Sequence, residues 1–343
     1  MIPHSRPCFD EPFLQAAERV IRSGQLAEGR EVVQLETLMA ESFGQAVAVA
    51  VDSGTSAIML ALQALKTTRP VRRVGIPAYA CRAVYFAVRA AGAEPVCMDC
   101  RADLRLDEEV AKKVAADVDA LVLVHPFGMV EPMAAADWPC SLIEDVAQSA
   151  GGMLNGKPLG SFGDISVTSL YATKPWGGAY GGVLACRDKA LAETVRCMRD
   201  ADTADASLPY AGNHHLSDLH AALAIARIGR AGKERSRREE LARQYDQWLG
   251  SGALVPVDRH SDGISYRYIV RASTGAEACI AALRSQGVAA TKPAPVSLDV
   301  LVGGKASPNA RQAVAECVSL PLLPDMSEQE RRRMHEAIQA CTQ

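Results

Sequence analysis

Two short segments hold the residues whose types and spacing suggest chemistry. The first is 144–148 (Glu-Asp-Val-Ala-Gln), and the second, about thirty residues later, runs from Ser169 to Lys174. A lysine amine can form a Schiff base with an aldehyde, and an aspartate at a strand end can keep a pyridine nitrogen protonated. With Gln148 one helical turn after Asp145, these are the parts needed to hold pyridoxal phosphate, whose ring acts as an electron sink.

Each of these residues also has an ordinary structural interpretation. Asp145 could be the N-cap of a following helix, and Lys174 could be a surface lysine in a glycine-flanked segment. A Schiff-base lysine needs a lowered pKa, which burial and a nearby cation can provide. One signal alone is weak, but the order and spacing of the segments together favour a cofactor site.

A third segment, 52–56 (Asp-Ser-Gly-Thr-Ser), follows a predicted strand and opens a predicted helix. Free backbone N–H groups and the helix dipole make such an end a site for anions. Gly54 allows close approach of the backbone, and the hydroxyls of Thr55 and Ser56 add donors. The alternative is plain N-capping by Ser53 or Thr55, which needs no ligand.

The elements that must position these segments follow an α/β pattern. Continuous apolar strands separated by helices predict a mostly parallel central sheet covered on both faces. Ligands in such sheets bind beyond the carboxyl ends of the strands, where segments 52–56 and 144–148 fall. The predicted strands are 46–51, 74–76, 95–98, 120–124, 141–143, 165–169 and 182–186, and the helices between them include 56–65 and 80–91.

The C-terminal part of the chain predicts a smaller α+β domain. A helical pattern over 217–249 leads into it, and the charged run 233–240 on that pattern is expected to be a solvated face. We therefore expect a large domain over 1–235 and a small domain over 236–343. The predicted elements of the small domain are a strand at 266–270, a helix at 277–286, a strand at 288–291, a Pro/Gly-rich loop at 293–308, and a last helix that begins at the capping box 327–330.

Composition excludes several function classes. The chain has 343 residues and a formal net charge of −3, so nothing favours nucleic acid or an anionic membrane. No stretch of about 20 apolar residues exists, and the N-terminus lacks the apolar core of a signal peptide. Ten scattered cysteines favour reduced thiols in the cytoplasm. Cys97 and Cys100 lack the second pair that a metal site would need, so we expect no metal.

The histidines carry weaker signals. His125 follows a predicted strand and could line the site. A structural role, in which neighbouring backbone groups bond the ring, is favoured. His214 and His215 are adjacent on a predicted loop, a spacing at which both cannot easily bind one metal ion.

Together these segments resemble the DegT/DnrJ/EryC1/StrS family of fold-type-I aminotransferases, which depend on pyridoxal phosphate. The resemblance covers most of the chain, and its motifs occur in the family's order. They are 23–36 (SGQLAEGREVVQLE), 53–57 (SGTSA), 77–79 (PAY), 92–96 (GAEPV), 125–128 (HPFG), 144–148 (EDVAQ), 160–164 (GSFGD), 169–174 (SLYATK), 212–213 (GN), 216–222 (LSDLHAA) and 319–321 (SLP).

The resemblance implies a fold-type-I architecture and a role for each matching residue. Lys174 would be the Schiff-base lysine and proton shuttle, Asp145 would pair the pyridine nitrogen, and Gln148 would contact the phenolic oxygen of the ring. Thr55, Ser56 and Ser169 would hold the phosphate, with Gly54 in the same turn. Asn213 would reach the phosphate of the neighbouring subunit's cofactor, which implies a homodimer with shared active sites.

Two positions depart from the family pattern. Cys81 stands where the family has an aromatic residue stacked on the ring, and a thiol supplies less surface. His215 stands in place of an arginine that is a candidate for binding the donor carboxylate. Trp176, directly after Lys174-Pro175, would shape the acceptor pocket or pack between subunits.

The function that this resemblance implies is transfer of an amino group from glutamate or glutamine to a nucleotide-linked keto-sugar. One alternative keeps the fold and chemistry but uses another keto acceptor, such as a cyclitol or a natural-product intermediate. A second alternative is a non-catalytic regulatory protein that retains the fold. The presence of both Lys174 and Asp145 favours an enzyme.

Overall fold

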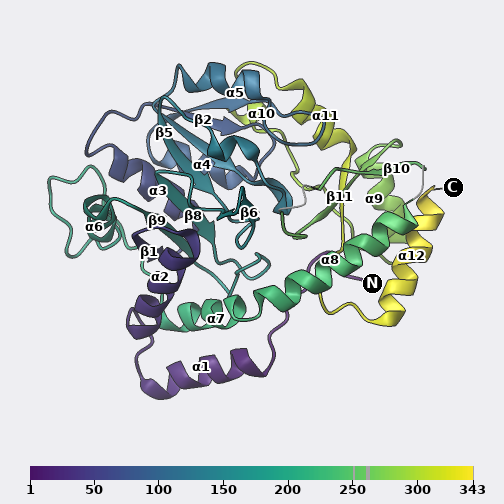
Figure 1. Cartoon of the computed structure of the whole chain (residues 1–343), viewed down its shortest axis with the longest axis horizontal. Helices are drawn as coiled ribbons and strands as arrows, with labels where there is room; N and C mark the ends of the chain where they lie inside the picture. The colour runs from purple at the N-terminus through teal and green to yellow at the C-terminus, as the bar shows by residue number, and fades with distance from the viewer. Residues whose placement is uncertain (250–251, 260–262, 343) are drawn as a thin grey trace.

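The computed structural model describes residues 1–249, 252–259 and 263–342, and its largest element is a seven-stranded sheet (Figure 1). The strands are β1 (Val47–Val51), β2 (Arg73–Pro77), β3 (Glu94–Met98), β4 (Ala120–Val124), β5 (Ser141–Asp145), β8 (Ile165–Ser169) and β9 (Gly182–Cys186). Their order is β1-β9-β8-β5-β4-β2-β3, and within this sheet only β9 runs antiparallel to its neighbours. The predicted mostly parallel sheet is confirmed, and all seven predicted strands form.

Helices cover both faces of this sheet. Side chains alternate along a strand, so Val49 and Val51 of β1 enter one core while Ala48 and Ala50 enter the other. The helices packed on the first face are α3 (Gly54–Leu65), α4 (Arg82–Ala90) and α6 (Lys189–Met198), and those on the second are α2 (Arg30–Phe43), α5 (Glu108–Ala115) and α7 (Asp218–Ile228). Burial on both faces explains why the strands are continuous apolar runs.

A second, smaller sheet has its own hydrophobic core. It is antiparallel and contains β10 (Leu254–Pro256), β11 (Tyr268–Ala272) and β12 (Cys317–Leu320). Helices α8 (Ala231–Trp248), α9 (Ala276–Ser285) and α12 (Glu328–Thr342) pack with it. The remaining elements are α1 (Glu11–Ser23), α10 (Leu298–Val302), α11 (Pro308–Glu316), the short helices η1 (Pro126–Gly128) and η2 (Pro132–Ala135), and the hairpin of β6 (Met153–Leu154) and β7 (Lys157–Pro158).

Helix α8 connects the two parts of the molecule (Figure 1). It runs from beneath the large sheet to the small one, so the predicted boundary at 235/236 falls inside a continuous helix. The chain start also joins the smaller part, because Ile2 is buried in its core and pairs with Val288. The division into two domains at that residue stays a prediction.

Three sequence predictions about local structure are wrong. No strand forms over 288–291, where the chain makes only isolated bridges to Ile2 and Ser319. The predicted loop 293–308 contains helix α10. The charged run 233–240 is not simply solvated, because Glu234 is buried and bonds Arg227 of the preceding helix. In each case contacts outside the local sequence pattern decide the structure.

The predicted capping box is confirmed at the start of α12. The Ser327 hydroxyl accepts the N–H of Glu330 at 3.2 Å, and the Glu330 carboxylate accepts the N–H of Ser327 at 2.8 Å. Among the described residues, no helix is both long and apolar enough to cross a bilayer.

Candidate active site

A cavity of about 290 Å³ lies at the carboxyl ends of β5 and β8, beside the start of α3. It brings together seven of the predicted site residues from four separate parts of the chain. They are Gly54, Thr55, Cys81, Asp145, Gln148, Ser169 and Lys174. The position beyond the strand ends is the one expected for an open α/β sheet.

Glu144 and Asp145 end β5 and point to opposite sides because side chains alternate along a strand. Asp145 faces the cavity and is buried, and its Oδ1 accepts the N–H of Ala147 at 2.9 Å. Burial raises the pKa of Asp145, although this backbone bond and the positive charge of Lys174 partly oppose the rise. A cationic partner in the cavity would offset the cost of keeping this carboxylate charged.

Glu144 is held on the other side by four hydrogen-bond donors. Its Oε1 accepts from His125 Nε2 at 3.0 Å and from the N–H of Gly160 at 2.7 Å. Its Oε2 accepts the N–H groups of Phe162 and Gly163, each at 2.9 Å. Burial alone would raise the pKa of Glu144, but these donors outweigh burial and lower it.

His125 is therefore a structural residue of the buried network. Its Nδ1 accepts the N–H of Glu131 at 2.9 Å, which assigns the ring proton to Nε2, the atom that faces Glu144. The ring is completely buried and does not line the cavity. This agrees with the interpretation favoured from the sequence.

The start of α3 forms a cradle suited to a phosphate group. The Ser53 hydroxyl accepts the N–H of Ser56 at 3.1 Å, so this end of the helix is capped. A Cβ atom at Gly54 would lie 2.9 Å from Cβ of Ser169, so the approach of the helix end to β8 needs glycine. Thr55 lines the cavity, whereas the Ser56 hydroxyl lies 2.9 Å from that of Ser53.

Gln148 is oriented by an unusual backbone position. Its Oε1 accepts the N–H of Phe127 at 2.9 Å, and Phe127 has a φ of 58°. The left-handed conformation is uncommon for a bulky residue and costs on the order of 1–3 kcal/mol. Because Oε1 is occupied by this bond, the amide N–H₂ of Gln148 is the end that can donate to a ligand oxygen.

Lys174 lies in a tight loop after β8. Its N–H donates to the carbonyl of Tyr171 at 2.8 Å, and its carbonyl accepts the N–H of Gly177 at 3.0 Å. A Cβ atom at Gly177 would lie 1.9 Å from that Tyr171 oxygen, so glycine is required for the loop to close. The loop directs the Lys174 side chain into the same cavity as Asp145.

The structure does not bring Asn213, His215 or Trp176 to this cavity within one chain. Asn213 is exposed, next to a segment that bonds Asp52 through the carbonyl of His214. The Nδ1 atom of His215 lies 2.5 Å from the carboxylate of Glu28, so its partner here belongs to its own chain. Ser217, not His215, caps the following helix.

Trp176 is buried and lines a different cavity, of about 220 Å³, beside Pro175 of the Lys174 loop. Its side chain is only 7% exposed and stacks on Phe43, with ring centroids 5.5 Å apart and planes 7° apart. The ring also belongs to the core that α2 forms against the sheet. A role for Trp176 in the acceptor pocket or between subunits stays a prediction.

Two tyrosines that were not predicted also line the cavity. Tyr171 and Tyr180 are exposed, and their rings meet edge to face with centroids 5.4 Å apart. Tyr171 lies three residues before Lys174, and that spacing was the available signal.

Over the described residues, no group of three histidine, cysteine or acidic side chains could hold a metal ion. The cysteines are free thiols. Burial raises the pKa of both Cys97 and Cys100 to about 12, so both are neutral thiols.

Comparison with known proteins agrees with this geometry. The model of the DegT/DnrJ/EryC1/StrS aminotransferase family matches residues 7–339, and the chain belongs to that family. It is a pyridoxal-phosphate-dependent aminotransferase of the α/β fold seen in its structural relatives.

Two solved structures show the similarity. The aminotransferase TlmJ from Streptoalloteichus hindustanus is 26% identical, with 99% of this chain and 98% of that chain covered and a TM-score of 0.88. DesV from S. venezuelae is also 26% identical, with 95% and 93% covered and a TM-score of 0.86. A curated relative, described as a pleiotropic regulatory protein from Geobacillus stearothermophilus, is 28% identical over 95% of this chain and 93% of its own length.

We predict that Glu144→Gln destabilises the protein in a pH-dependent way. An amide cannot accept all four donors, and each group left unsatisfied costs about 1–3 kcal/mol. The folded-state pKa of Glu144 is lowered, so its stabilisation is complete above the ordinary glutamate pKa of about 4.3 and is lost as pH falls through the folded value. The gap in melting temperature between wild type and variant should be widest near neutral pH and shrink below about pH 4.

The matched control is Glu41→Gln, which changes an exposed glutamate of α2 and should leave the melting temperature unchanged. A gap that stays constant across this pH range would show that the charge of Glu144 does not supply the stabilisation.

Proposed function

We propose that this aminotransferase transfers the amino group of glutamate or glutamine to a nucleotide-linked keto-sugar, with Lys174 as the residue that bonds the cofactor aldehyde. The observation that carries the proposal is a single cavity that holds Lys174, the buried Asp145 and the capped start of α3. The similarity to DesV and TlmJ supports amino transfer as the reaction class.

Each residue of the cavity has a proposed task. The cofactor, when bound, supplies an aldehyde and an electron-withdrawing ring. The Asp145 carboxylate binds and keeps protonated the ring nitrogen, and its burial strengthens that interaction because the dielectric is low. The N–H₂ of Gln148 donates to the ring oxygen. The amine of Lys174 moves the proton that the reaction transfers.

The phosphate is proposed to bind at the start of α3. The free N–H groups and the dipole of that helix favour an anion, and the Thr55 and Ser169 hydroxyls line the same end of the cavity. Ser56 contributes its hydroxyl when its bond to the Ser53 hydroxyl is replaced by a bond to the phosphate. Cys81 also lines this cavity, and its small thiol leaves more open space than an aromatic ring would.

A non-catalytic regulatory role is the second candidate function. The relative from Geobacillus stearothermophilus that carries a regulatory description matches nearly the full chain, which favours keeping this candidate. Both Lys174 and Asp145 are retained and share one cavity, which favours catalysis. A further alternative is the same chemistry with a non-sugar keto acceptor, such as a cyclitol.

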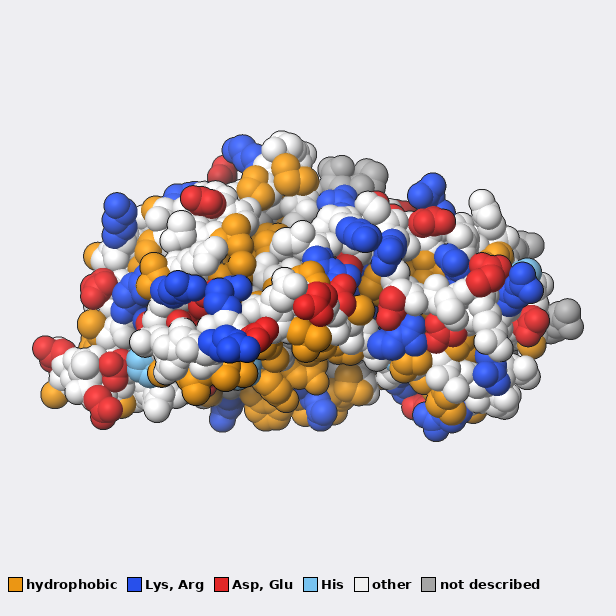
Figure 2. Space-filling view, turned by 90° about the horizontal axis from the view of Figure 1, so that it is seen from below, with side chains coloured by type: hydrophobic (Ala, Val, Ile, Leu, Met, Phe, Trp, Pro, Cys, Tyr) orange, Lys and Arg blue, Asp and Glu red, His pale blue; other side chains and the backbone are white. Residues whose placement is uncertain are grey.

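We further propose a homodimer with shared active sites. Apolar side chains gather along one edge of the face that carries α1 (Figure 2), and Leu14 and Ile21 of this helix are 61% and 60% exposed. An exposed apolar face of this kind favours association. Asn213 is exposed and lies outside its own chain's cavity, as a residue that serves a partner's cofactor would. The predicted contact of His215 with the donor stays a prediction.

The function is tested by titrating the purified holoenzyme with amino donors. Glutamate or glutamine should remove the visible absorbance of the bound cofactor, and a nucleotide-linked keto-sugar should restore it. Borohydride should attach the cofactor to the one peptide that contains Lys174. Lys174→Ala should lower turnover by about 1000-fold or more, because both covalent attachment and proton transfer depend on this amine.

The control is Lys157→Ala, which replaces an exposed lysine of β7. In this variant borohydride should still attach the cofactor to the peptide that contains Lys174, and the activity should equal that of wild type. Cofactor attached to a peptide without Lys174 would refute the assignment. A spectrum that no amino donor changes would favour the regulatory candidate.

The shared site predicts complementation between two inactive variants. Lys174→Ala and Asn213→Ala damage different halves of a site if Asn213 serves the partner. Mixing them under conditions that exchange subunits should therefore restore about a quarter of wild-type activity, the share of sites that receive both intact residues. A fully active monomer, or a mixture as inactive as its parts, would contradict the shared site.

A further inference from the structure

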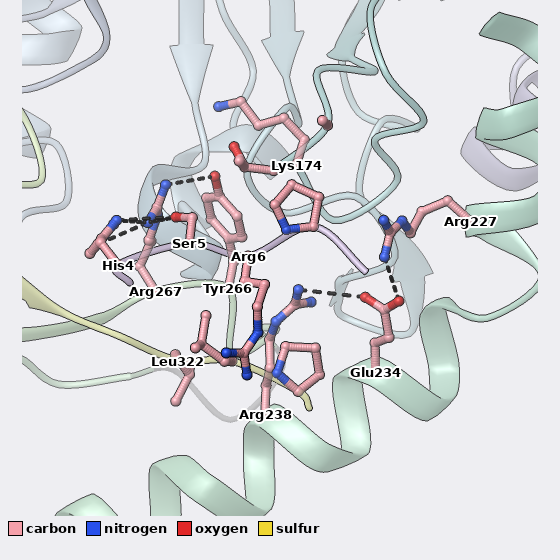
Figure 3. Close-up of a pocket in the computed structure, with 15 residues that line it drawn as sticks. His4, Ser5, Arg6, Lys174, Arg227, Glu234, Arg238, Tyr266, Arg267 and Leu322 are labelled. Atoms are coloured by element: carbon pink, nitrogen blue, oxygen red, sulfur yellow. Dashed lines mark hydrogen bonds and ion pairs between the residues drawn. The ribbon is translucent and has the colours of Figure 1, made fainter. Parts of the chain in front are cut away.

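A small pocket lies beside the Lys174 loop, between the chain start, α8 and the residues that precede β11 (Figure 3). Its volume is about 30 Å³, which is room for one water-sized species and not for a metabolite. Positively charged side chains dominate its lining. These are Arg6, Lys174, Arg227, Arg238 and Arg267, against the single carboxylate of Glu234.

Glu234 does not balance these charges. Its Oε1 lies 2.5 Å from Nη1 of Arg227 and its Oε2 lies 3.5 Å from Nη2 of Arg238, so one carboxylate serves two guanidinium groups. The Nε of Arg238 is buried, and no hydrogen-bond partner for it exists among the described residues. Burial lowers the pKa of Arg238, which is the expected sign of a buried cation that lacks full compensation.

Within the described residues, the side-chain partners of Arg267 are uncharged. Its Nη1 lies 2.8 and 2.9 Å from the two ring nitrogens of His4, of which a neutral ring offers one as acceptor, and the guanidinium donates to the Ser5 hydroxyl at 3.0 Å and to the Tyr266 hydroxyl at 3.2 Å. Burial, with the charge of Arg267, lowers the pKa of His4 to about 3, so this ring is neutral. Arg6 is balanced separately by Asp325 and Glu330. Arg267, unlike Arg238, therefore has no carboxylate partner within the described part of the chain.

Tyr266 lies among these cations. It is only 6% exposed, and Figure 3 shows its ring standing below Lys174 with the hydroxyl bonded to Arg267. The Nζ of Lys174 lies 5.7 Å from the ring centroid, and the guanidinium carbon of Arg267 lies 4.8 Å from it. Both distances are within the range of cation–π attraction.

The surroundings change the acidity of this hydroxyl. Burial alone would raise the pKa of Tyr266, but the charges of Lys174 and Arg267 and the hydrogen bonds from Thr173 and Arg267 outweigh burial and lower it. Two other buried tyrosines, Tyr245 and Tyr268, have the opposite shift, because burial raises their pKa.

We propose that Tyr266 is a positioning residue for Lys174: its ring supports the lysine side chain, and its hydroxyl, bonded by Arg267, holds that ring in place. The inference rests on the proposed role of Lys174 and adds a residue from the smaller part of the molecule to that role.

The test is an ultraviolet titration of tyrosine ionisation in the cofactor-free protein. The chain has eight tyrosines, so about one eighth of the total absorbance change should occur as a step whose midpoint lies below the ordinary tyrosine pKa of about 10. Tyr266→Phe should remove that early step. Lys174→Met and Arg267→Gln should each move it to higher pH, because each removes a charge that stabilises the anion.

The matched control is Tyr85→Phe, which removes a hydroxyl that donates to the carbonyl of Leu301 and should keep the early step. If Tyr266→Phe fails to fold, Lys174→Met still decides the matter with Tyr266 in place. An early step that survives Tyr266→Phe, or one that Lys174→Met leaves unmoved, would overturn the proposal. The titration needs no cofactor, so its result is independent of whether borohydride traps Lys174.

Discussion

The rest of the site depends on the burial of one carboxylate, that of Glu144. A buried charge is tolerated only when hydrogen bonds replace its hydration, and here four donors do so. Three of them are backbone N–H groups of the loop 160–163, so the carboxylate fixes that loop as well as the end of β5. Since neighbouring residues of a strand face opposite ways, anchoring Glu144 on one side commits Asp145 to the cavity on the other.

A second set of contacts ties the smaller part of the molecule to the cavity. The carbonyl of Phe127 accepts the N–H of Arg267 at 3.1 Å, while the N–H of Phe127 donates to Gln148. The neighbouring carbonyl of Gly128 accepts the N–H of Ile264 at 2.8 Å. The left-handed turn at Phe127 thus places one residue between the cavity-lining amide of Gln148 and the segment that carries Tyr266.

Much of the fold and of the cavity could be predicted from the sequence. Apolar strands buried on both faces have a local signature, and the segments around Asp52, Asp145 and Lys174 follow strand ends, so their convergence followed from topology. The exceptions have distant partners. Trp176 is turned into the core by stacking on Phe43, and His215 is held by Glu28, about 190 residues away in the sequence. Tyr266 was predicted only as part of a strand, because its environment combines the chain start, α8 and the Lys174 loop.

The central claim is that the buried Asp145 carboxylate, in the cavity of Lys174, makes this chain an aminotransferase. The most direct test is the rate of the first half-reaction with a saturating amino donor, followed by rapid-mixing absorbance in wild type and Asp145→Asn at equal cofactor occupancy. The account predicts that the variant reacts about 100-fold more slowly, as expected for the loss of a charged hydrogen bond worth about 3 kcal/mol. Asp107→Asn, at the N-cap of α5, should react as wild type. A near-normal rate in Asp145→Asn would contradict the account.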